Sequence, residues 1–268
     1  MTLSRGARYV LASLMGVGLA FIYIPLTVVV INSFNSSRTF SWPPTDFTTQ
    51  WWTKALENTG VREALRWSIL AGVCATAIAL LLGTALAFAV SRYKFFGRDT
   101  ISLLVVLPIS LPGVVTGIAL NNAFTKGAGM STGLLTVVIG HATFCIVIVY
   151  NNAFARLKRM GSSLQEASMD LGANGITTFR LITLPNLASA LFAGGLLAFG
   201  LSFDEIVVTT FTAGPGIQTL PIWIYNNLFR PNQAPIVNVV AAILVIFSIL
   251  PIYLSQRLSQ DNATGGRL

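Results

Sequence analysis

Two adjacent carboxylates, Asp204 and Glu205, lie within an otherwise apolar stretch, residues 187–211. A carboxylate in the middle of a membrane-length helix costs about 2.5 kcal/mol or more, and it is tolerated where it faces protein or water. On an uninterrupted helix Glu205 returns to the face of Ala198, and Asp204 lies about 100° away. No Lys or Arg of the apolar stretches lies within a few turns. The pair is therefore interpreted as a binding point for a cation; the alternative is a charged pair in a water-filled vestibule that only fixes the helix.

The sequence lacks the patterns of an enzyme active site. It contains no G-x-x-x-x-G-K-S/T phosphate-binding loop, so ATP hydrolysis by this chain is not expected. His141 is the only histidine, and Cys74 and Cys145 lie in apolar stretches, where buried packing is typical. We predict no catalytic residues and no metal or cofactor bound by this chain. His141 is expected to be a hydrogen-bonded structural residue.

Composition indicates an integral membrane protein. Hydrophobic residues make up 54% of the chain and charged residues 10%, against about a quarter charged in soluble domains. A helix needs about 20 apolar residues to cross a bilayer, and six stretches qualify: residues 9–31, 64–90, 100–124, 133–154, 187–211 and 235–256. We predict an all-α protein with six transmembrane helices, in which residues 1–268 form a single domain.

The distribution of Lys and Arg predicts the orientation of these helices. Of the 17 cationic residues, eleven fall on the side that holds both termini and residues 162–185, and six fall on the other side. The positive-inside rule places the first side in the cytoplasm. All five Trp residues lie in or beside segments of the opposite side, as an interfacial belt would. The net charge of +8 therefore follows from topology and requires no nucleic-acid partner.

Small residues and helix breakers shape the predicted bundle. The stretch 187–211 carries a small residue at every fourth position, which predicts close helix contact: Ala190, Gly194, Ala198 and Ser202. The stretch 100–124 contains Pro108, Pro112, Gly113 and Gly117, which predict a kinked or unwound helix. Such a break either exposes carbonyls to a pathway or is a packing kink.

The longest extracytoplasmic segment runs to about residue 62. Residues 47–56 are expected to form a short interfacial helix with Trp51, Trp52 and Leu56 on the lipid side. Two interpretations remain open, a surface for a substrate-binding protein and a loop anchored at the membrane.

Residues 162–185, SSLQEASMDLGANGITTFRLITLP, form the main polar interruption on the cytoplasmic side. Ser163 and Glu166 have the spacing of a capping box that begins a short helix. Gly172 is placed to end that helix, and Asn174-Gly175 to form a turn. A second short helix is expected from about residue 176, with Pro185 as its end. The sequence therefore predicts a helix-turn-helix elbow.

The elbow resembles the EAA loop of bacterial ABC-importer permeases. The pattern E-A-A, three residues, G, nine residues, I-x-L-P is matched from Glu166 to Pro185, with Ser168 in place of the second Ala. The resemblance implies a helix that docks on a separate ATPase subunit, its surface and turn formed by Glu166, Ala167, Ser168, Asp170 and Gly172. Glu166 is also explained by helix capping alone, and the two roles are compatible.

The resemblance extends to the spermidine/putrescine type of permease. It is carried by NSFNSS at residues 32–37, GHATFC at 140–145 and LSFDEIVV at 201–208. Polyamine-type permeases have Ser-x-Asp-Asp/Glu at the last of these, which implies that Ser202, Asp204 and Glu205 lie on the substrate path. It also implies a multi-pass protein of the bacterial inner membrane. Its implied partners are two ATP-binding subunits that hold ATP and Mg, a second homologous permease and an extracytoplasmic solute-binding protein.

These observations predict a permease subunit that imports polyamines by alternating access. Import of another small organic solute by the same kind of transporter is the first alternative. A different class, the ion-coupled secondary transporter, would use the carboxylates as a coupling site. That class does not need the elbow, and the sequence contains no evident inverted repeat.

Overall fold

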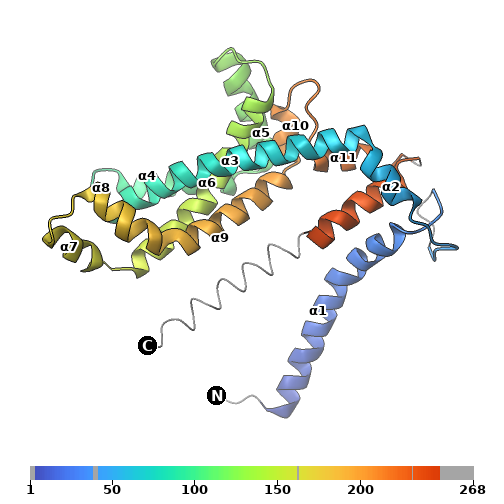
Figure 1. Ribbon diagram of the computed structural model, residues 1–268, viewed down its shortest axis with the longest axis horizontal. Coiled ribbons are helices and arrows are strands. Elements are labelled where there is room, and N and C mark those ends of the chain that lie inside the picture. The colour runs from blue at the N-terminus through green and yellow to red at the C-terminus, as the bar shows by residue number, and fades with distance from the viewer. Residues whose placement is uncertain (1–3, 39–41, 162, 231, 248–268) are drawn as a thin grey trace. The chain divides into compact units, whose positions relative to one another are not determined.

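The protein is mainly helical in the part described by the computed structural model, which comprises residues 4–38, 42–161, 163–230 and 232–247 (Figure 1). In these ranges the only extended pairing is a single antiparallel bridge between Asn35 and Phe47. The helices are α1 (Arg5–Asn32), α2 (Gln50–Glu57), α3 (Thr59–Arg92), α4 (Arg98–Ser110), α5 (Gly113–Asn122), α6 (Leu134–Arg159), α7 (Ser163–Asp170), α8 (Gly175–Thr178), α9 (Leu184–Phe203), α10 (Val207–Thr212), α11 (Leu220–Asn227) and a last helix, Ala234–Phe247. The expected all-α class is confirmed for these residues.

Several of these helices have the length and apolarity of membrane spans. Among the described residues four qualify, namely α1, α3, α6 and the continuous helix Gly175–Phe203; a fifth is formed if the bent pair α4 and α5 is one span. The helix Ala234–Phe247 is apolar but shorter. The sixth predicted stretch, 235–256, extends beyond residue 247 and so lies partly outside the described residues.

The chain divides into two compact units, Met1–Arg62 with Trp223–Ile252, and Glu63–Ile222 with Tyr253–Leu268. In the first unit the short helix predicted after α1 is present as α2. Trp51 of α2 is buried, and its indole N–H donates to the carbonyl of Asn35 at 2.9 Å. The prediction that Trp51 faces lipid is therefore wrong, because the indole donor is satisfied by a buried carbonyl. Leu56 is exposed, as expected.

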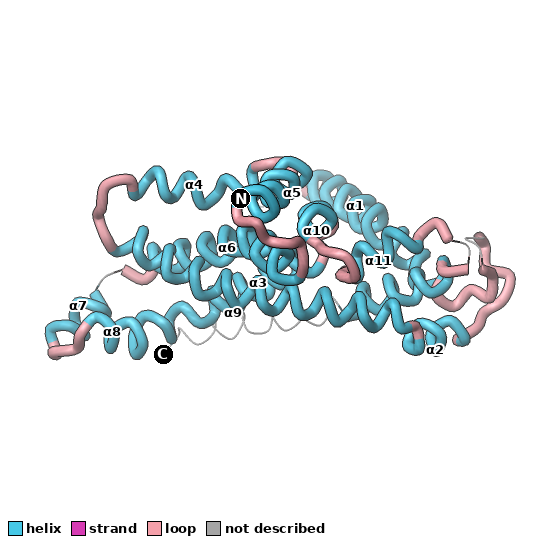
Figure 2. Tube along the Cα trace, turned by 90° about the horizontal axis from the view of Figure 1, so that it is seen from above, coloured by secondary structure: helices cyan, strands magenta, loops and turns pink. Residues whose placement is uncertain are grey.

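In the second unit α3, α6 and α9 lie side by side, and small residues set their spacing (Figures 1 and 2). A Cβ added at Gly83 of α3 would lie 3.0 Å from the carbonyl oxygen of Ile146 in α6. A Cβ at Gly194 of α9 would lie 3.2 Å from Cβ of Asn152, also in α6. The predicted small-residue contact of residues 187–211 is confirmed. The core between these helices and α10 contains Ala75, Ala79, Ala142, Phe144, Cys145, Val149, Ala198 and Val208.

The predicted break in residues 100–124 is also present. The helix pair 98–110 and 113–127 bends by 105° at Leu111 and Pro112. Beyond the bend α5 packs on α10 (Figures 1 and 2). The Asn121 side-chain amide donates to the carbonyl of Phe211 at 2.6 Å. A Cβ at Gly117 would lie 2.5 Å from the Phe211 ring, so only glycine permits this approach.

The helix that follows the elbow does not end at Pro185, contrary to the prediction. From α8 it passes through one π-turn, Phe179–Thr183, directly into α9, and Pro185 lies in the first turn of α9. In the π-turn the N–H of Leu184 donates to the carbonyl of Phe179, five residues earlier. Pro185 has no N–H to donate to the preceding turn. The wider turn shifts the hydrogen-bond register just before Pro185, so the missing N–H does not end the helix. The side chain of Asn186 donates to the carbonyl of Ile182 at 2.7 Å.

Candidate functional site

The carboxylates Asp204 and Glu205 lie in a helix break, and not on the uninterrupted helix that was predicted. Helix α9 ends at Phe203, Asp204 follows as its C-cap, and α10 begins at Val207. Oε1 of Glu205 accepts a hydrogen bond from the N–H of Val208 at 2.8 Å, so this side chain satisfies a free donor at the start of α10. A side chain that binds nearby backbone groups competes with helix continuation. Glu205 therefore has a hydrogen-bond partner within the chain, and this partner is a neutral backbone N–H.

A buried chain of polar groups crosses this break and includes the only histidine. His141 of α6 is fully buried; its Nδ1 lies 2.7 Å from Oγ of Ser202 and its Nε2 lies 2.8 Å from Oγ1 of Thr209. Thr209 donates its hydroxyl hydrogen to the carbonyl of Glu205 at 2.8 Å. Because a hydroxyl has one hydrogen, Nε2 of His141 must be the donor to Thr209. In the neutral ring Nδ1 then accepts from Ser202.

This chain connects three helices at one point. His141 joins the end of α9, through Ser202, to the first turn of α10, through Thr209. The expectation of a hydrogen-bonded structural histidine is confirmed. Ser202 is buried, so it holds the break in place and does not line an open surface. Sequence reasoning missed the contribution of Thr209. Its spacing from Glu205 was a usable signal, because a Thr hydroxyl often donates to the backbone carbonyl four residues earlier.

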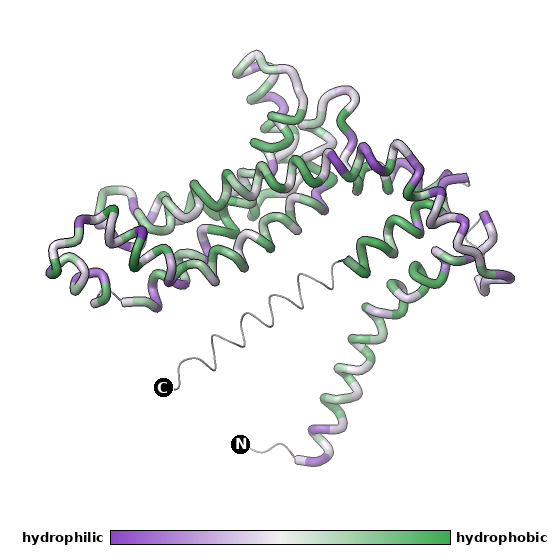
Figure 3. The backbone as a smooth tube through the Cα atoms, viewed as in Figure 1, coloured by the Kyte–Doolittle hydropathy of each residue, from purple (hydrophilic) through white to green (hydrophobic). Residues whose placement is uncertain are grey.

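A hollow of about 450 Å³ lies on the α9 side of the break. Asp204, which is exposed, and Glu205, which is half-buried, lie at one end of it. The rest of the lining is apolar and comprises Leu196, Leu197, Gly200 and Leu201. Figure 3 shows the same contrast, with α9 hydrophobic over most of its length. Such a hollow suits a molecule with a cationic group and an aliphatic body.

At the other end of α9, the predicted elbow is formed by α7 and α8 (Figure 1). Gly172 has a φ of +87°, the left-handed conformation that ends a helix. The N–H of Gly172 bonds to the carbonyl of Met169 and the N–H of Ala173 to that of Ser168, as in a Schellman motif. The expected C-terminal role of Gly172 is confirmed. Asn174 is more than a turn residue, because its side chain caps α8 by accepting from the N–H of Thr177 at 2.8 Å.

The start of α7 leaves the capping-box prediction open. Ser163 is the first residue given for the helix, and the residue before it lies outside the described residues, so the structure does not test the cap.

The elbow residues predicted to contact an ATPase divide into an outward and an inward group. Glu166, Ala167, Asp170 and Gly172 are exposed. Ser168 is half-buried, and its hydroxyl lies 3.1 Å from that of Thr178 in α8, so it holds the two short helices together. Beside the outward group lies an apolar surface, formed by Leu164, Met169, Leu171 and Ile176, all at least half exposed. Sequence reasoning missed this surface, although apolar residues within a short polar segment indicate one.

The two groups of predicted site residues are not brought together. The elbow precedes α9 and the carboxylates follow it, and a helix of 20 residues is about 30 Å long. Helix α9 is the direct connection between them. The exposed elbow therefore lies at one end of α9 and the hollow with its carboxylates at the other.

The sequence matches a known family over most of its length. The family model described as the binding-protein-dependent transport system inner membrane component matches residues 79–263. The spermidine/putrescine transport system permease protein PotC of Escherichia coli (strain K12) is 34% identical over 247 residues, covering 92% of each chain. The putrescine transport system permease protein PotI of the same organism is 34% identical over 235 residues, covering 85% of this chain and 83% of its own.

Solved structures show the same fold. A chain from a bacterial ABC transporter involved in the import of the acidic polysaccharide alginate superposes with a TM-score of 0.72 at 16% identity, covering 97% of this chain and 99% of its own. A chain from the MetNI methionine ABC transporter, in an inward-facing conformation, gives a TM-score of 0.60 at 18% identity, covering 80% of this chain and 99% of its own. The chain belongs to the family of inner-membrane components of binding-protein-dependent transport systems.

Proposed function

We propose that this chain is a permease subunit of an ABC importer that moves putrescine and spermidine into the cytoplasm. As a non-catalytic subunit it forms one transmembrane domain with six spans in the bacterial inner membrane. Both termini and the elbow lie in the cytoplasm.

The observation that carries this proposal is the hollow beside the α9–α10 break. Its two carboxylates lie at one end and leucine side chains line the rest. A polyamine has the matching chemistry, since it carries ammonium groups on a chain of methylenes. Relatives named for spermidine and putrescine transport, at 34% identity over most of the chain, support this choice of substrate.

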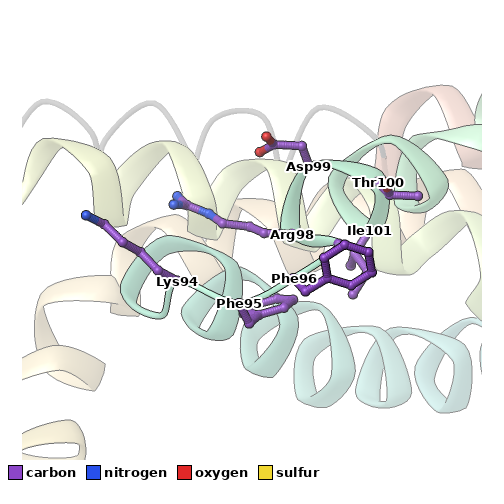
Figure 4. Close-up of a pocket in the computed structure, with 8 residues that line it drawn as sticks. Lys94, Phe95, Phe96, Arg98, Asp99, Thr100 and Ile101 are labelled. Carbon is purple, nitrogen blue, oxygen red and sulfur yellow. The ribbon is translucent and has the colours of Figure 1, made fainter.

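The proposed orientation is supported by the turn between α3 and α4. This turn carries Lys94 and Arg98 beside Phe95 and Phe96, and the side chains spread around an open hollow of about 520 Å³ (Figure 4). Basic residues gather in cytoplasmic loops, where they also meet anionic lipid headgroups. The side chain of Arg92, just before this turn, donates to the carbonyl of Gly161 at 2.9 Å. The elbow therefore belongs to the same side of the membrane as the turn.

The exposed face of the elbow supports the proposed partners. Leu171 is 90% exposed and Ile176 81% exposed, next to the carboxylates of Glu166 and Asp170. An apolar patch with acidic neighbours fits a cleft on a separate ATPase subunit, which holds ATP and Mg. Because each permease has one elbow, two ATPase subunits require a second, homologous permease. An extracytoplasmic solute-binding protein delivers the substrate; the permease contacts membrane lipid and no nucleic acid.

The test is ATP-dependent uptake of labelled putrescine and spermidine by the complete complex in liposomes, with and without the binding protein. Saturable uptake that needs both ATP and the binding protein is expected. The double variant Asp204→Asn with Glu205→Gln should abolish uptake and leave the assembled complex intact. Uptake of neither polyamine, with ATPase activity still stimulated by the loaded binding protein, would refute the substrate but not the importer. Uptake driven by an ion gradient without ATP would favour the secondary transporter.

A further inference from the structure

Gln165 is the one described residue of α7 whose side chain is buried. Its neighbours Leu164 and Glu166 are exposed, whereas Gln165 is only 8% exposed. Its Nε2 donates to Oγ1 of Thr183 at 2.8 Å. Thr183 is fully buried and is the last residue before α9. The outward face of α7 is thus free for a partner, while its inward face is bonded to the base of α9.

The acceptor lies in an unusual part of the helix. Thr183 ends the π-turn Phe179–Thr183, and π-turns occur mostly as single turns, often at functional positions. The π-turn inserts one residue relative to α-helical spacing, so it offsets the face of α9 from that of α8 by about 100°. Ser168 bonds to Thr178 before this turn and Gln165 to Thr183 at its end. The two bonds therefore hold α7 to both sides of the offset.

Residues 171–174 also connect α7 to α8 covalently, but they lie outside both helices, and the backbone N–H groups of Leu171, Gly172 and Ala173 bond back to α7 and not forward to α8. A displacement of α7 that is carried only by this link can be absorbed by rotation of its backbone dihedrals. A displacement carried by a buried hydrogen bond acts directly on the first turn of α9. At its far end α9 is fixed to the carboxylate break through Ser202 and His141.

We propose that Gln165 is a positioning residue for transport, which through Thr183 couples movement of the docking helix α7 to movement of α9. The inference rests on the proposed function, because it presumes that an ATPase partner moves α7. It adds a specific connection between the two ends of the site. Loss of this hydrogen bond uncouples ATP hydrolysis from the movement at the α9–α10 break, while the docking face of α7 stays unchanged.

The test uses a reporter at the far end of α9 that does not depend on the substrate. Leu197, which lines the hollow and is 59% exposed, is replaced in the complete complex by Leu197→Cys. The rate of its labelling by a charged maleimide is measured with and without ATP and vanadate. Complex with only the native Cys74 and Cys145 gives the background. Thr183→Val and Gln165→Ala should each reduce the ATP-dependent change in labelling by about fivefold, the equilibrium effect of one buried neutral hydrogen bond.

Two further variants separate positioning from a general loss of structure. Gln165→Glu should keep the ATP-dependent change, because a carboxylate accepts a hydrogen bond from the Thr183 hydroxyl. Thr76→Val is the matched control for Thr183→Val, since the hydroxyl of Thr76 is buried and has no hydrogen-bond partner among the described residues. It should respond to ATP as the unaltered complex does.

The possible results are distinct. A full ATP-dependent change in an assembled Thr183→Val complex would overturn the inference and leave the proposed function standing. No ATP-dependent change in the otherwise unaltered reporter complex would overturn the proposed function, and the inference with it. Failure of Gln165→Glu to respond, with normal assembly, would also contradict the proposed role of the hydrogen bond.

Discussion

Replacement of His141 tests whether the polar chain across the α9–α10 break stabilises the fold. His141→Leu keeps a side chain of similar size and removes both hydrogen bonds, to Ser202 at 2.7 Å and to Thr209 at 2.8 Å. Hydrogen bonds between membrane helices contribute about 0.6 kcal/mol on average and up to about 1.7 kcal/mol. Two of them give about 1–3 kcal/mol. For a domain of this size that loss corresponds to a fall in melting temperature of about 2–12 °C.

The measurement is the melting temperature of the purified complex in detergent, with uptake measured beside it. His141→Gln, which keeps an amide donor and acceptor, should fall between the wild type and His141→Leu. In His141→Leu, Thr209 loses its hydrogen bond to α6 while it still bonds to the carbonyl of Glu205. Glu205 is then less firmly positioned, so uptake should need more putrescine to reach its half-maximal rate.

A double-mutant cycle identifies the interaction itself. Ser202→Ala and His141→Leu remove the same hydrogen bond, so their effects should fall short of additivity by about 0.5 kcal/mol or more. Strictly additive effects would refute the reasoning, as would a His141→Leu complex whose melting temperature equals that of the wild type.

Three other predictions concern single positions. Glu205→Gln keeps an oxygen for the N–H of Val208 and should lose uptake with little loss of stability, whereas Glu205→Ala should also lower stability by about 0.5–2 kcal/mol, as measured by melting. Gly83→Val should destabilise the complex by about 1–3 kcal/mol, because its side chain would meet the backbone of α6; an unchanged melting temperature would contradict the packing. Gly172→Ala should weaken ATPase association through a backbone cost of about 1–2 kcal/mol, and Gly172→Asn less, in a pull-down of the ATPase subunit.

The sequence predicted the features that depend on local chemistry. Apolar length located the helices, Gly194 located a close contact, and Gly172 located the end of α7. Each of these follows from the size or conformational range of one residue. The family pattern added the elbow, whose spacing is fixed along the chain.

The failures arose where a side chain competes with the regular helix. Glu205 binds the N–H of Val208 and so ends the predicted continuous helix, and apolarity gives no sign of this. Pro185 was expected to end a helix, but a π-turn accommodates it. Trp51 was expected in lipid because its type favours the interface, yet the side chain is buried and its indole N–H donates to the carbonyl of Asn35, which precedes it in the loop. Such partners are set by tertiary contacts, which no single stretch of sequence contains.

The π-turn before α9 also makes the chain sensitive to its own length at this point. Deleting one residue from Phe179–Thr183 would restore ordinary α-helical spacing and cost no hydrogen bond within the turn. It would nevertheless turn every later residue of α9 by about 100° relative to the elbow and draw it about 1.5 Å closer. Ser202 would then face away from His141, and the hollow with its carboxylates would turn away from α6. Substitutions in this turn are local events, but a change of one residue in its length alters the far end of the helix.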